Sequence, residues 1–273
     1  MLFNCGRFTL DLTTPQVMGI VNVTPDSFSD GGQFAATNHA VAHALKLIEE
    51  GAAIVDVGGE STRPNAKPVS LQEELDRVIP VIEALAKRVN MPISIDTYKP
   101  KVMQAAIAAG ASMVNDVRAL QETGALEVVA NSDAGVCLMH MQGTPQTMQD
   151  DPQYDNVVDD ISDFLVARLQ ACIDGGIAKN RILLDPGFGF GKTRAHNITL
   201  IQQLAQLNAL GQPLLVGLSR KSILGQVTGN DVNARLYASV AASVIAAQKG
   251  AKMLRVHDVK ATVEALKVVA AIQ

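Results

Sequence analysis

Asp96, Asn115 and Asp185 each stand near the end of an apolar run that is typical of a β-strand. Strand ends are where α/β enzymes keep their chemistry, so side chains from different strands can converge there. Two carboxylates and one amide around one pocket suit a flat ligand with a fork of N–H donors, because a carboxylate accepts two parallel hydrogen bonds from such an edge. A ligand without those donors would leave buried acceptors unpaired. The alternative role for the aspartates is helix capping.

Two basic segments lie near the end of the chain, Ser219-Arg-Lys-Ser222 and Arg255-Val-His257. Arg255 and His257 are two residues apart, so they project on the same side of a strand. Ser222 is expected at a helix start, where free N–H groups favour an anion. Together these residues predict a site for phosphate. The alternative is that the first segment carries solvated surface charges and that the histidine is structural.

A glycine-rich segment, Asp185-Pro-Gly-Phe-Gly-Phe-Gly-Lys-Thr193, is similar to a P-loop but has the wrong spacing. A P-loop needs four residues between its first glycine and Gly-Lys-Ser/Thr. Here only three follow Gly187, and Pro186 stands where the earlier glycine is needed. The spacing therefore disfavours an NTPase. We expect the glycines to let the backbone approach a flat ligand, with Phe188 and Phe190 as apolar walls; the alternative for these rings is ordinary packing.

The sequence does not predict a site built from several metal-binding side chains. His140 lies between two methionines with no other histidine at ligand spacing, so we interpret it as a core histidine or one that supports a site residue. The cysteines are three in number and widely spaced, which predicts neither a disulfide framework nor a zinc site. They are Cys5, Cys137 and Cys172.

Eight apolar runs recur along the chain and predict buried parallel strands. Their number and spacing predict one closed (β/α)8 TIM barrel, with an open doubly wound sheet as the alternative. Residues 1–14 alternate in hydrophobicity and are expected to form a hairpin that closes the barrel bottom. The predicted strands are 17–22, 53–57, 92–96, 112–116, 135–140, 181–185, 213–218 and 252–257.

Helices are expected between these strands, and their boundaries have sequence signals. Gly51, Gly110 and Gly250 each follow a helical pattern, as expected where φ becomes positive. Ser70 and Glu73 have the spacing of a capping box at a helix start.

Three connections are long and rich in Pro, Gly, Ser and Asp, and each follows a predicted strand: 23–38, 58–70 and 141–155. They are therefore expected on the catalytic face, where they could serve as lids. The first two are rich in anion donors, which favours segments that order over a phosphate ester. Plain solvated turns are the alternative.

The composition predicts one domain over residues 1–273. Hydrophobic residues make up 48% of the chain, charged residues 18%, and the net charge is −4. This mild acidity gives no reason to expect nucleic acid or an anionic membrane as a partner. The N-terminus lacks the pattern of a secretory signal, and no apolar run has the length of a membrane helix, so we expect a cytoplasmic protein.

Taken together, motifs along nearly the whole chain resemble the bacterial dihydropteroate synthase family. These motifs are Asn22-Val-Thr-Pro-Asp-Ser-Phe-Ser-Asp-Gly-Gly, Asp56-Val-Gly-Gly-Glu-Ser-Thr-Arg-Pro, Ile95-Asp-Thr, Asn115-Asp, Leu138-Met-His-Met-Gln-Gly, Asp185-Pro-Gly-Phe-Gly-Phe-Gly-Lys, Ser219-Arg-Lys-Ser and Arg255-Val-His-Asp. The sequence departs from the family pattern at Tyr98, where a small residue is expected, and at Asn65, where glycine is common.

The resemblance implies that the chain condenses 6-hydroxymethyl-7,8-dihydropterin diphosphate with 4-aminobenzoate to give 7,8-dihydropteroate and diphosphate, with Mg²⁺ as cofactor. It implies that Asn22 contacts the metal and that the pterin edge is read by the carboxylates and amide described above. The implied catalytic residues are Asp30, Asp96, Lys221, Arg255 and His257. The implied substrate-binding residues are Phe28, Thr62, Arg63, Pro64, Asp96, Asn115, Met139, Asp185, Phe190, Gly217, Lys221, Ser222, Arg255 and His257.

No positioned nucleophile stands beside the basic cluster, which favours early loss of diphosphate over a covalent intermediate. Three other functions compete with this one. They are a non-catalytic pterin-binding partner subunit, a pterin-binding methyltransferase domain, and a barrel lyase or aldolase with Lys221 as a Schiff-base lysine. The family also implies a homodimer through helices near the C-terminus, and the apolar stretch Leu236–Ala247 permits it.

Overall fold

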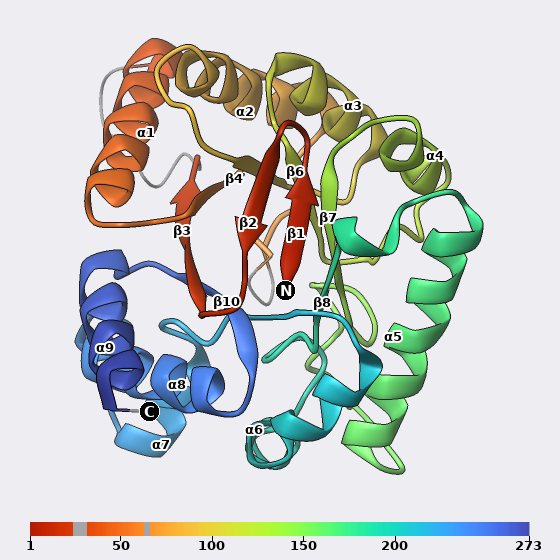
Figure 1. Cartoon of the computed structure of the whole chain (residues 1–273), viewed down its shortest axis with the longest axis vertical. Coiled ribbons are helices and arrows are strands. Elements are labelled where there is room, and N and C mark those ends of the chain that lie inside the picture. The colour runs from red at the N-terminus through yellow and green to blue at the C-terminus, as the bar shows by residue number, and fades with distance from the viewer. Residues whose placement is uncertain (24–31, 63–65, 273) are drawn as a thin grey trace.

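The computed structural model describes residues 1–23, 32–62 and 66–272 and shows a closed barrel of eight parallel strands (Figure 1). The strands follow one another around the barrel in chain order, and β10 closes it against β3. This confirms the predicted TIM barrel and excludes the open sheet. Every predicted strand overlaps an observed one, with ends that differ by at most two residues. The strands are β3 (Gln16–Asn22), β4 (Ile54–Gly58), β5 (Ile93–Asp96), β6 (Met113–Asp116), β7 (Gly135–Met139), β8 (Ile182–Asp185), β9 (Leu214–Val216) and β10 (Ala251–Val256).

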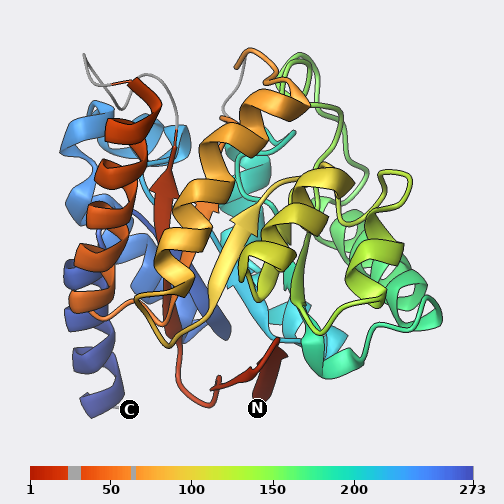
Figure 2. The same ribbon diagram turned by 90° about the horizontal axis from the view of Figure 1, so that it is seen from above.

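The predicted N-terminal hairpin is present and covers the end of the barrel where the strands begin. Its strands β1 (Leu2–Cys5) and β2 (Phe8–Asp11) pair antiparallel, and Figure 2 shows them below the barrel strands. Phe3 and Cys5 are buried against the first inward side chains of the barrel, which form a separate apolar cluster with them. The hairpin therefore seals the barrel bottom and leaves the opposite end for chemistry.

Helices surround the barrel, as Figure 1 shows. They bury their apolar faces against its outer surface. None of them, among the described residues, is long and apolar enough to cross a membrane. The helices are α1 (Gly32–Glu49), α2 (Leu71–Ala86), α3 (Pro100–Ala109), α4 (Ala125–Ala130), α5 (Val157–Asp174), α6 (Arg194–Gln202), α7 (Ser222–Thr228), α8 (Leu236–Gln248) and α9 (Val259–Ile272).

The predicted helix-end signals are confirmed in part. Gly51, Gly110 and Gly250 have φ values of +103°, +116° and +101°. The Ser70 side chain accepts a hydrogen bond from the Glu73 N–H at 3.2 Å. The Glu73 carboxylate pairs with Arg77 on the next turn, so only the serine half of the predicted capping box is described.

One predicted loop is shorter than expected. Helix α1 begins at Gly32, so residues 32–38 are helical rather than part of the connection after β3. The reason is local: the turn-forming residues end at Gly32, and the next seven residues contain neither Pro nor Gly, so nothing stops the helix. Residues 24–31 lie outside the described part of the chain.

Candidate active site

The site is a polar layer that lies directly above the apolar bottom of the barrel. Because strand side chains alternate between faces, the residue two positions after an inward apolar side chain also points inward. Five of the inward apolar residues at the bottom are Ile54, Met113, Leu183, Leu215 and Met253. Two positions further along the same strands, and just after β9, stand Asp56, Asn115, Asp185, Gly217 and Arg255. The sequence alternation therefore places the polar residues in one layer.

Arg255 is the centre of this layer. Its Nε lies 2.6 Å from Asp56 Oδ2, and its Nη2 lies 2.6 Å from Asp96 Oδ2. Asn115 Nδ2 donates to the same Asp56 oxygen at 3.0 Å. Four strands thus contribute to one hydrogen-bonded cluster, and the predicted meeting of acids and bases at one mouth is confirmed for these residues.

Asp56 is the site residue that sequence reasoning missed. It is fully buried, and its Oδ1 has no hydrogen-bond partner among the described residues. A signal was available, since Asp56 ends an apolar run in the same way as Asp96. An unpaired buried carboxylate oxygen is costly, so this atom marks a place where a bound donor would be stabilised.

The charges of this cluster shift one another. Burial raises the pKa of Asp96 to about 7, and the Arg255 guanidinium acts in the opposite direction. Burial also disfavours the Arg255 cation, but Asp56 and Asp96 outweigh it and raise the pKa of Arg255. The arginine therefore stays charged, while Asp96 titrates near neutrality.

Lys221 and Asp185 form the other half of the site. Asp185 Oδ1 accepts a hydrogen bond from the Gly187 N–H at 2.7 Å. Lys221 Nζ donates to the carbonyl of Phe188 and lies 4.5 Å from the centre of the Phe190 ring. Burial lowers the pKa of Lys221 to about 8, and the Asp185 carboxylate opposes this shift. Burial raises the pKa of Asp185, and Lys221 lowers it.

The two phenylalanines of the glycine-rich segment have different positions. Phe190 is half-buried beside Lys221, as expected for a wall of the site. Phe188 is fully buried in the outer core, so its predicted role as a wall is wrong. Its backbone carbonyl, not its ring, reaches Lys221.

The segment after β9 is held to the segment after β10. His257 Nδ1 lies 3.0 Å from Ser219 Oγ. Arg220 pairs with Asp258 through two contacts, of 3.0 and 2.6 Å. Arg220 is therefore an ion-pair partner rather than a free phosphate ligand. Ser222 begins α7 and is exposed, as predicted for a helix start.

The remaining predicted residues lie at the same end of the barrel or outside the described chain. Met139 is buried at the end of β7, in register with Asp185. Asn22 is exposed at the end of β3, opposite Gly58. Thr62 is half-buried after β4. The residues whose predicted roles lie outside the described part are Phe28, Asp30, Arg63 and Pro64, together with Asn65.

The donor set around Asn22 fits a magnesium ion only when a substrate supplies further ligands. Within the described residues no group of three or more His, Cys, Asp or Glu side chains could hold a metal. Mg²⁺ is commonly bound by one or two protein oxygens, with water and substrate phosphates completing the octahedron. One exposed amide oxygen at the barrel mouth is compatible with that mode.

Tyr98, the departure from the family pattern, lies beside the mouth. Its hydroxyl donates to Glu60 at 3.4 Å, and the Arg118 guanidinium lies 4.6 Å from its ring centre. Lys99 Nζ contacts both Glu60 and Glu74. Tyr98 therefore belongs to a network that holds the start of the connection after β4.

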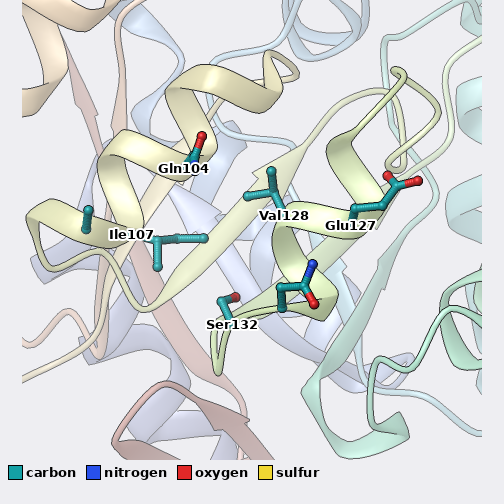
Figure 3. Close-up of a pocket in the computed structure, with 7 residues that line it drawn as sticks. Gln104, Ile107, Glu127, Val128 and Ser132 are labelled. Atoms are coloured by element: carbon teal, nitrogen blue, oxygen red, sulfur yellow. The ribbon is translucent and has the colours of Figure 1, made fainter.

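A separate cavity of about 340 Å³ lies outside the barrel between α3 and α4 (Figure 3). It shares no residue with the cluster around Arg255. Its lining is Gln104, Ile107, Ala108, Glu127, Val128, Asn131 and Ser132.

Comparison with known proteins agrees with this geometry. The pterin binding enzyme family model matches residues 18–257. The dihydropteroate synthase of Escherichia coli (strain K12) is 53% identical over 263 residues, covering 96% of this chain and 93% of that protein. The chain belongs to the dihydropteroate synthases. It is thus a member of a transferase family, and the resemblance seen in the sequence motifs is confirmed.

Solved dihydropteroate synthases have the same fold over the whole chain. The Xanthomonas albilineans enzyme with 4-aminobenzoic acid has a TM-score of 0.94 and 54% identity, covering 100% of this chain and 98% of that one. The same enzyme in complex with 7,8-dihydropteroate has a TM-score of 0.92 and 51% identity, covering 100% and 99%. The non-catalytic pterin-binding partner subunit considered above would be expected to lack Lys221, Arg255 or Asn22, and the sequence contains all three.

Proposed function

We propose that this chain joins 6-hydroxymethyl-7,8-dihydropterin diphosphate to 4-aminobenzoate and releases 7,8-dihydropteroate and diphosphate. The observation that carries the proposal is the single polar layer in which Arg255 bonds Asp56 and Asp96 at 2.6 Å. This layer offers acceptors for a heterocycle and cations for a leaving group in one mouth. The Xanthomonas albilineans relative has been solved with 4-aminobenzoic acid and with 7,8-dihydropteroate, which supports these ligands.

The pterin is proposed to lie across the acceptors. Its aminopyrimidinone edge presents adjacent N–H donors, which suit Asp185 and the unpaired oxygen of Asp56. Asn115 supplies an amide, and Met139 and Gly217 supply a short apolar border. The site is selective because a ligand without the N–H edge leaves these buried carboxylates without new donors.

The diphosphate is proposed to lie toward the basic side of the mouth. Arg255 lies in β10, and His257, two residues later and just after the end of this strand, projects on the same side. Thr62 lies shortly after the end of β4. Bound at Asn22, Mg²⁺ would neutralise charge on the diphosphate oxygens. The protein groups orient the leaving group and stabilise its growing negative charge.

The reaction is proposed to begin with the leaving group. The bond between the methylene carbon and the diphosphate oxygen breaks, and its electron pair leaves with diphosphate. The 4-aminobenzoate nitrogen then attacks the pterin-stabilised methylene cation with its lone pair, and the resulting ammonium gives its proton to water. Lys221 and Phe190 border the amine side, and Ser222 at the start of α7 is proposed to bind the aminobenzoate carboxylate. Phe28, Arg63 and Pro64 are proposed to complete this slot, and Asp30 is proposed as a further catalytic residue.

One assay tests both the function and the order of steps. Diphosphate release is measured with and without 4-aminobenzoate, alongside positional oxygen exchange within the labelled pterin diphosphate. We expect 7,8-dihydropteroate only when both substrates are present, and exchange without the amine. No dihydropteroate under any condition would refute the function. Exchange that strictly requires the amine would refute early departure of diphosphate but leave the function standing.

The enzyme is also proposed to form a homodimer. Exposed apolar side chains lie on the adjacent helices α8 and α9: Tyr237 is 84% exposed, Ile245 44%, Val268 61% and Ile272 76%. Such residues favour a protein–protein interface. Sedimentation of wild type and of Tyr237→Asp tests this: a dimer that the substitution dissociates supports it, and a wild-type monomer refutes it.

A cytoplasmic location is proposed as well. The three cysteines are free thiols, which supports this location.

A further inference from the structure

The glycine-rich loop after β8 is held by side chains along its whole length. Each carbonyl from Gly187 to Lys192 accepts a hydrogen bond from a side chain. The donors, in chain order of the carbonyls, are Lys192 at 2.9 Å, Lys221, Gln149 at 2.7 Å, Lys192 at 3.0 Å, Tyr154 at 2.6 Å and Asn197 at 3.2 Å. Loops run over the protein surface, where water is available to their backbone groups, so a side-chain donor for six successive carbonyls is a specific feature of this loop. These hydrogen bonds therefore restrict the loop to one backbone conformation.

Lys192 is the donor that closes the loop on itself. Its side chain turns inward and is 3% exposed, so it is not available as a P-loop lysine. Its Nζ bonds the carbonyls of Gly187 and Phe190 and lies 3.0 Å from His140 Nδ1. An ammonium group has three N–H donors for these three partners, while burial lowers the pKa of Lys192 well below its ordinary value. A neutral amine has two N–H donors for the two carbonyls and a lone pair that accepts from His140 Nδ1–H, so the three contacts fit either protonation state. Burial, followed by the Lys192 charge, lowers the pKa of His140 to about 3, so His140 is neutral and its Nδ1 can accept.

Two glycines of the loop approach neighbouring groups too closely for a larger side chain. Gly187 has φ +68°, and a Cβ there would lie 1.9 Å from the His140 carbonyl oxygen. Gly189 has φ +79°, and a Cβ there would lie 3.3 Å from the Lys221 side chain. The loop backbone therefore lies close to the His140 carbonyl at Gly187 and close to the Lys221 side chain at Gly189.

The loop places three groups in the polar layer. The Gly187 N–H bonds Asp185 at 2.7 Å, the Phe188 carbonyl accepts from Lys221, and the Phe190 ring lies 4.5 Å from the same ammonium. Lys192 donates to the carbonyl of Gly187, the residue before Phe188, and to the backbone carbonyl of Phe190. Its hydrogen bonds therefore reach the backbone of the loop and His140, and not the Phe190 ring or the Lys221 side chain.

We propose that Lys192 is a positioning residue: through its bonds to Gly187 and Phe190 it sets the loop shape that presents the Phe188 carbonyl and the Phe190 ring to Lys221. The proposal rests on the proposed function for its kinetic consequences. Its structural part does not depend on that function, because the hydrogen bonds join groups of the chain itself.

The test compares Lys192→Met with Arg181→Met. The methionine keeps the length and apolar stem of the lysine but has no donors. Arg181 is a matched control, because it also donates to two backbone carbonyls, of Ala134 and Val129, but lies before β8 at the other end of the barrel. Amide hydrogen exchange over residues 187–192 is measured in both variants, together with KM and kcat for both substrates well below the melting temperature.

We expect Lys192→Met to exchange the loop amides at least about tenfold faster and to raise KM for the pterin diphosphate by about tenfold, since misplacement by about 1 Å near a reacting centre costs up to about 100-fold. We expect Arg181→Met to change neither the exchange rate nor KM.

Lys192→Gln retains two donors, so its exchange rate and KM should fall between those of wild type and Lys192→Met. It replaces Lys192→Met in the test if that variant does not fold. Wild-type exchange in both Lys192 variants, or equal KM changes in the Arg181 control, would overturn the proposal. If wild type makes no dihydropteroate, the proposed function fails, and the exchange data still decide the role of Lys192.

Discussion

Arg255 Nη2 lies 2.6 Å from Asp96 Oδ2 across the mouth of the barrel, so the cation expected to hold the leaving group is the ion-pair partner of a carboxylate expected to face the pterin ring. The pair is linked to Asp56 and Asn115 through the other guanidinium nitrogen. Substrate therefore enters a site whose charges already hold one another in place. Such preorganisation stabilises developing charge without reorganisation during the reaction.

Removing the arginine should destabilise the fold as well as abolish turnover. Arg255→Ala leaves the buried carboxylates of Asp56 and Asp96 without their cation, which costs about 3–5 kcal/mol of unfolding free energy. Urea unfolding at pH 7.5 measures this loss, and the coupled assay measures activity. Lys46→Ala removes an exposed ion pair with Glu50 and should leave both nearly unchanged. Arg255→Ala with wild-type stability would mean that the two carboxylates do not depend on this cation.

Asp185→Asn should weaken pterin binding by about 1–3 kcal/mol, because the amide presents a donor where the ligand also has one. This is about 5- to 150-fold in Kd, measured by titration with a pterin that lacks the diphosphate. Asp116→Asn is the matched control. Asp116 is also buried at a strand end, but its oxygens accept from the N–H groups of Arg118 and Leu120. Asp116→Asn should lower the free energy of unfolding and leave the Kd for the pterin unchanged. A weaker pterin affinity in Asp116→Asn, together with an unchanged affinity in Asp185→Asn, would show that Asp116 binds the pterin instead of Asp185.

The pH profile of kcat/KM should be bell-shaped with limbs near 7 and 8. Asp96 has a pKa of about 7 and must be ionised to accept N–H donors, so activity rises as pH passes 7. Lys221 has a pKa of about 8 and must be protonated to keep its positive charge beside Asp185 on the amine side of the mouth, so activity falls above 8. Asp96→Asn should remove the acidic limb, and Lys221→Arg should remove the alkaline limb because arginine stays charged. If the acidic limb persists in Asp96→Asn and the alkaline limb persists in Lys221→Arg, the two limbs come from titration of the substrates instead.

The hairpin below the barrel should contribute stability without chemistry. Phe3→Ala empties a fully buried position under the barrel and should cost about 3–5 kcal/mol of unfolding free energy. Calorimetry or urea unfolding measures this cost. At 15 °C, where the variant remains folded, KM for both substrates should equal that of wild type. A selective rise in one KM would show that the barrel bottom is coupled to the mouth.

Sequence alone determined which elements form and which strands end on a polar residue. The apolar runs gave the eight strands, and the alternation two residues after each inward apolar side chain put Asn115, Asp185 and Arg255 on the same inward face. These are local properties, since strand period and the positive φ at a helix end do not depend on distant contacts. The family motifs added the reaction, because they are specific only when taken together.

Only the tertiary structure decided which charges meet. Arg255 bonds residues 199 and 159 positions away, and no spacing in the chain predicts those partners, because they depend on how the barrel closes. The same closure left Asp56 with an unpaired oxygen and buried the Phe188 ring. It also turned Lys192 away from solvent and into its own loop. Alternation shows which face a side chain occupies; the position of the neighbouring strands and loops decides what it touches there.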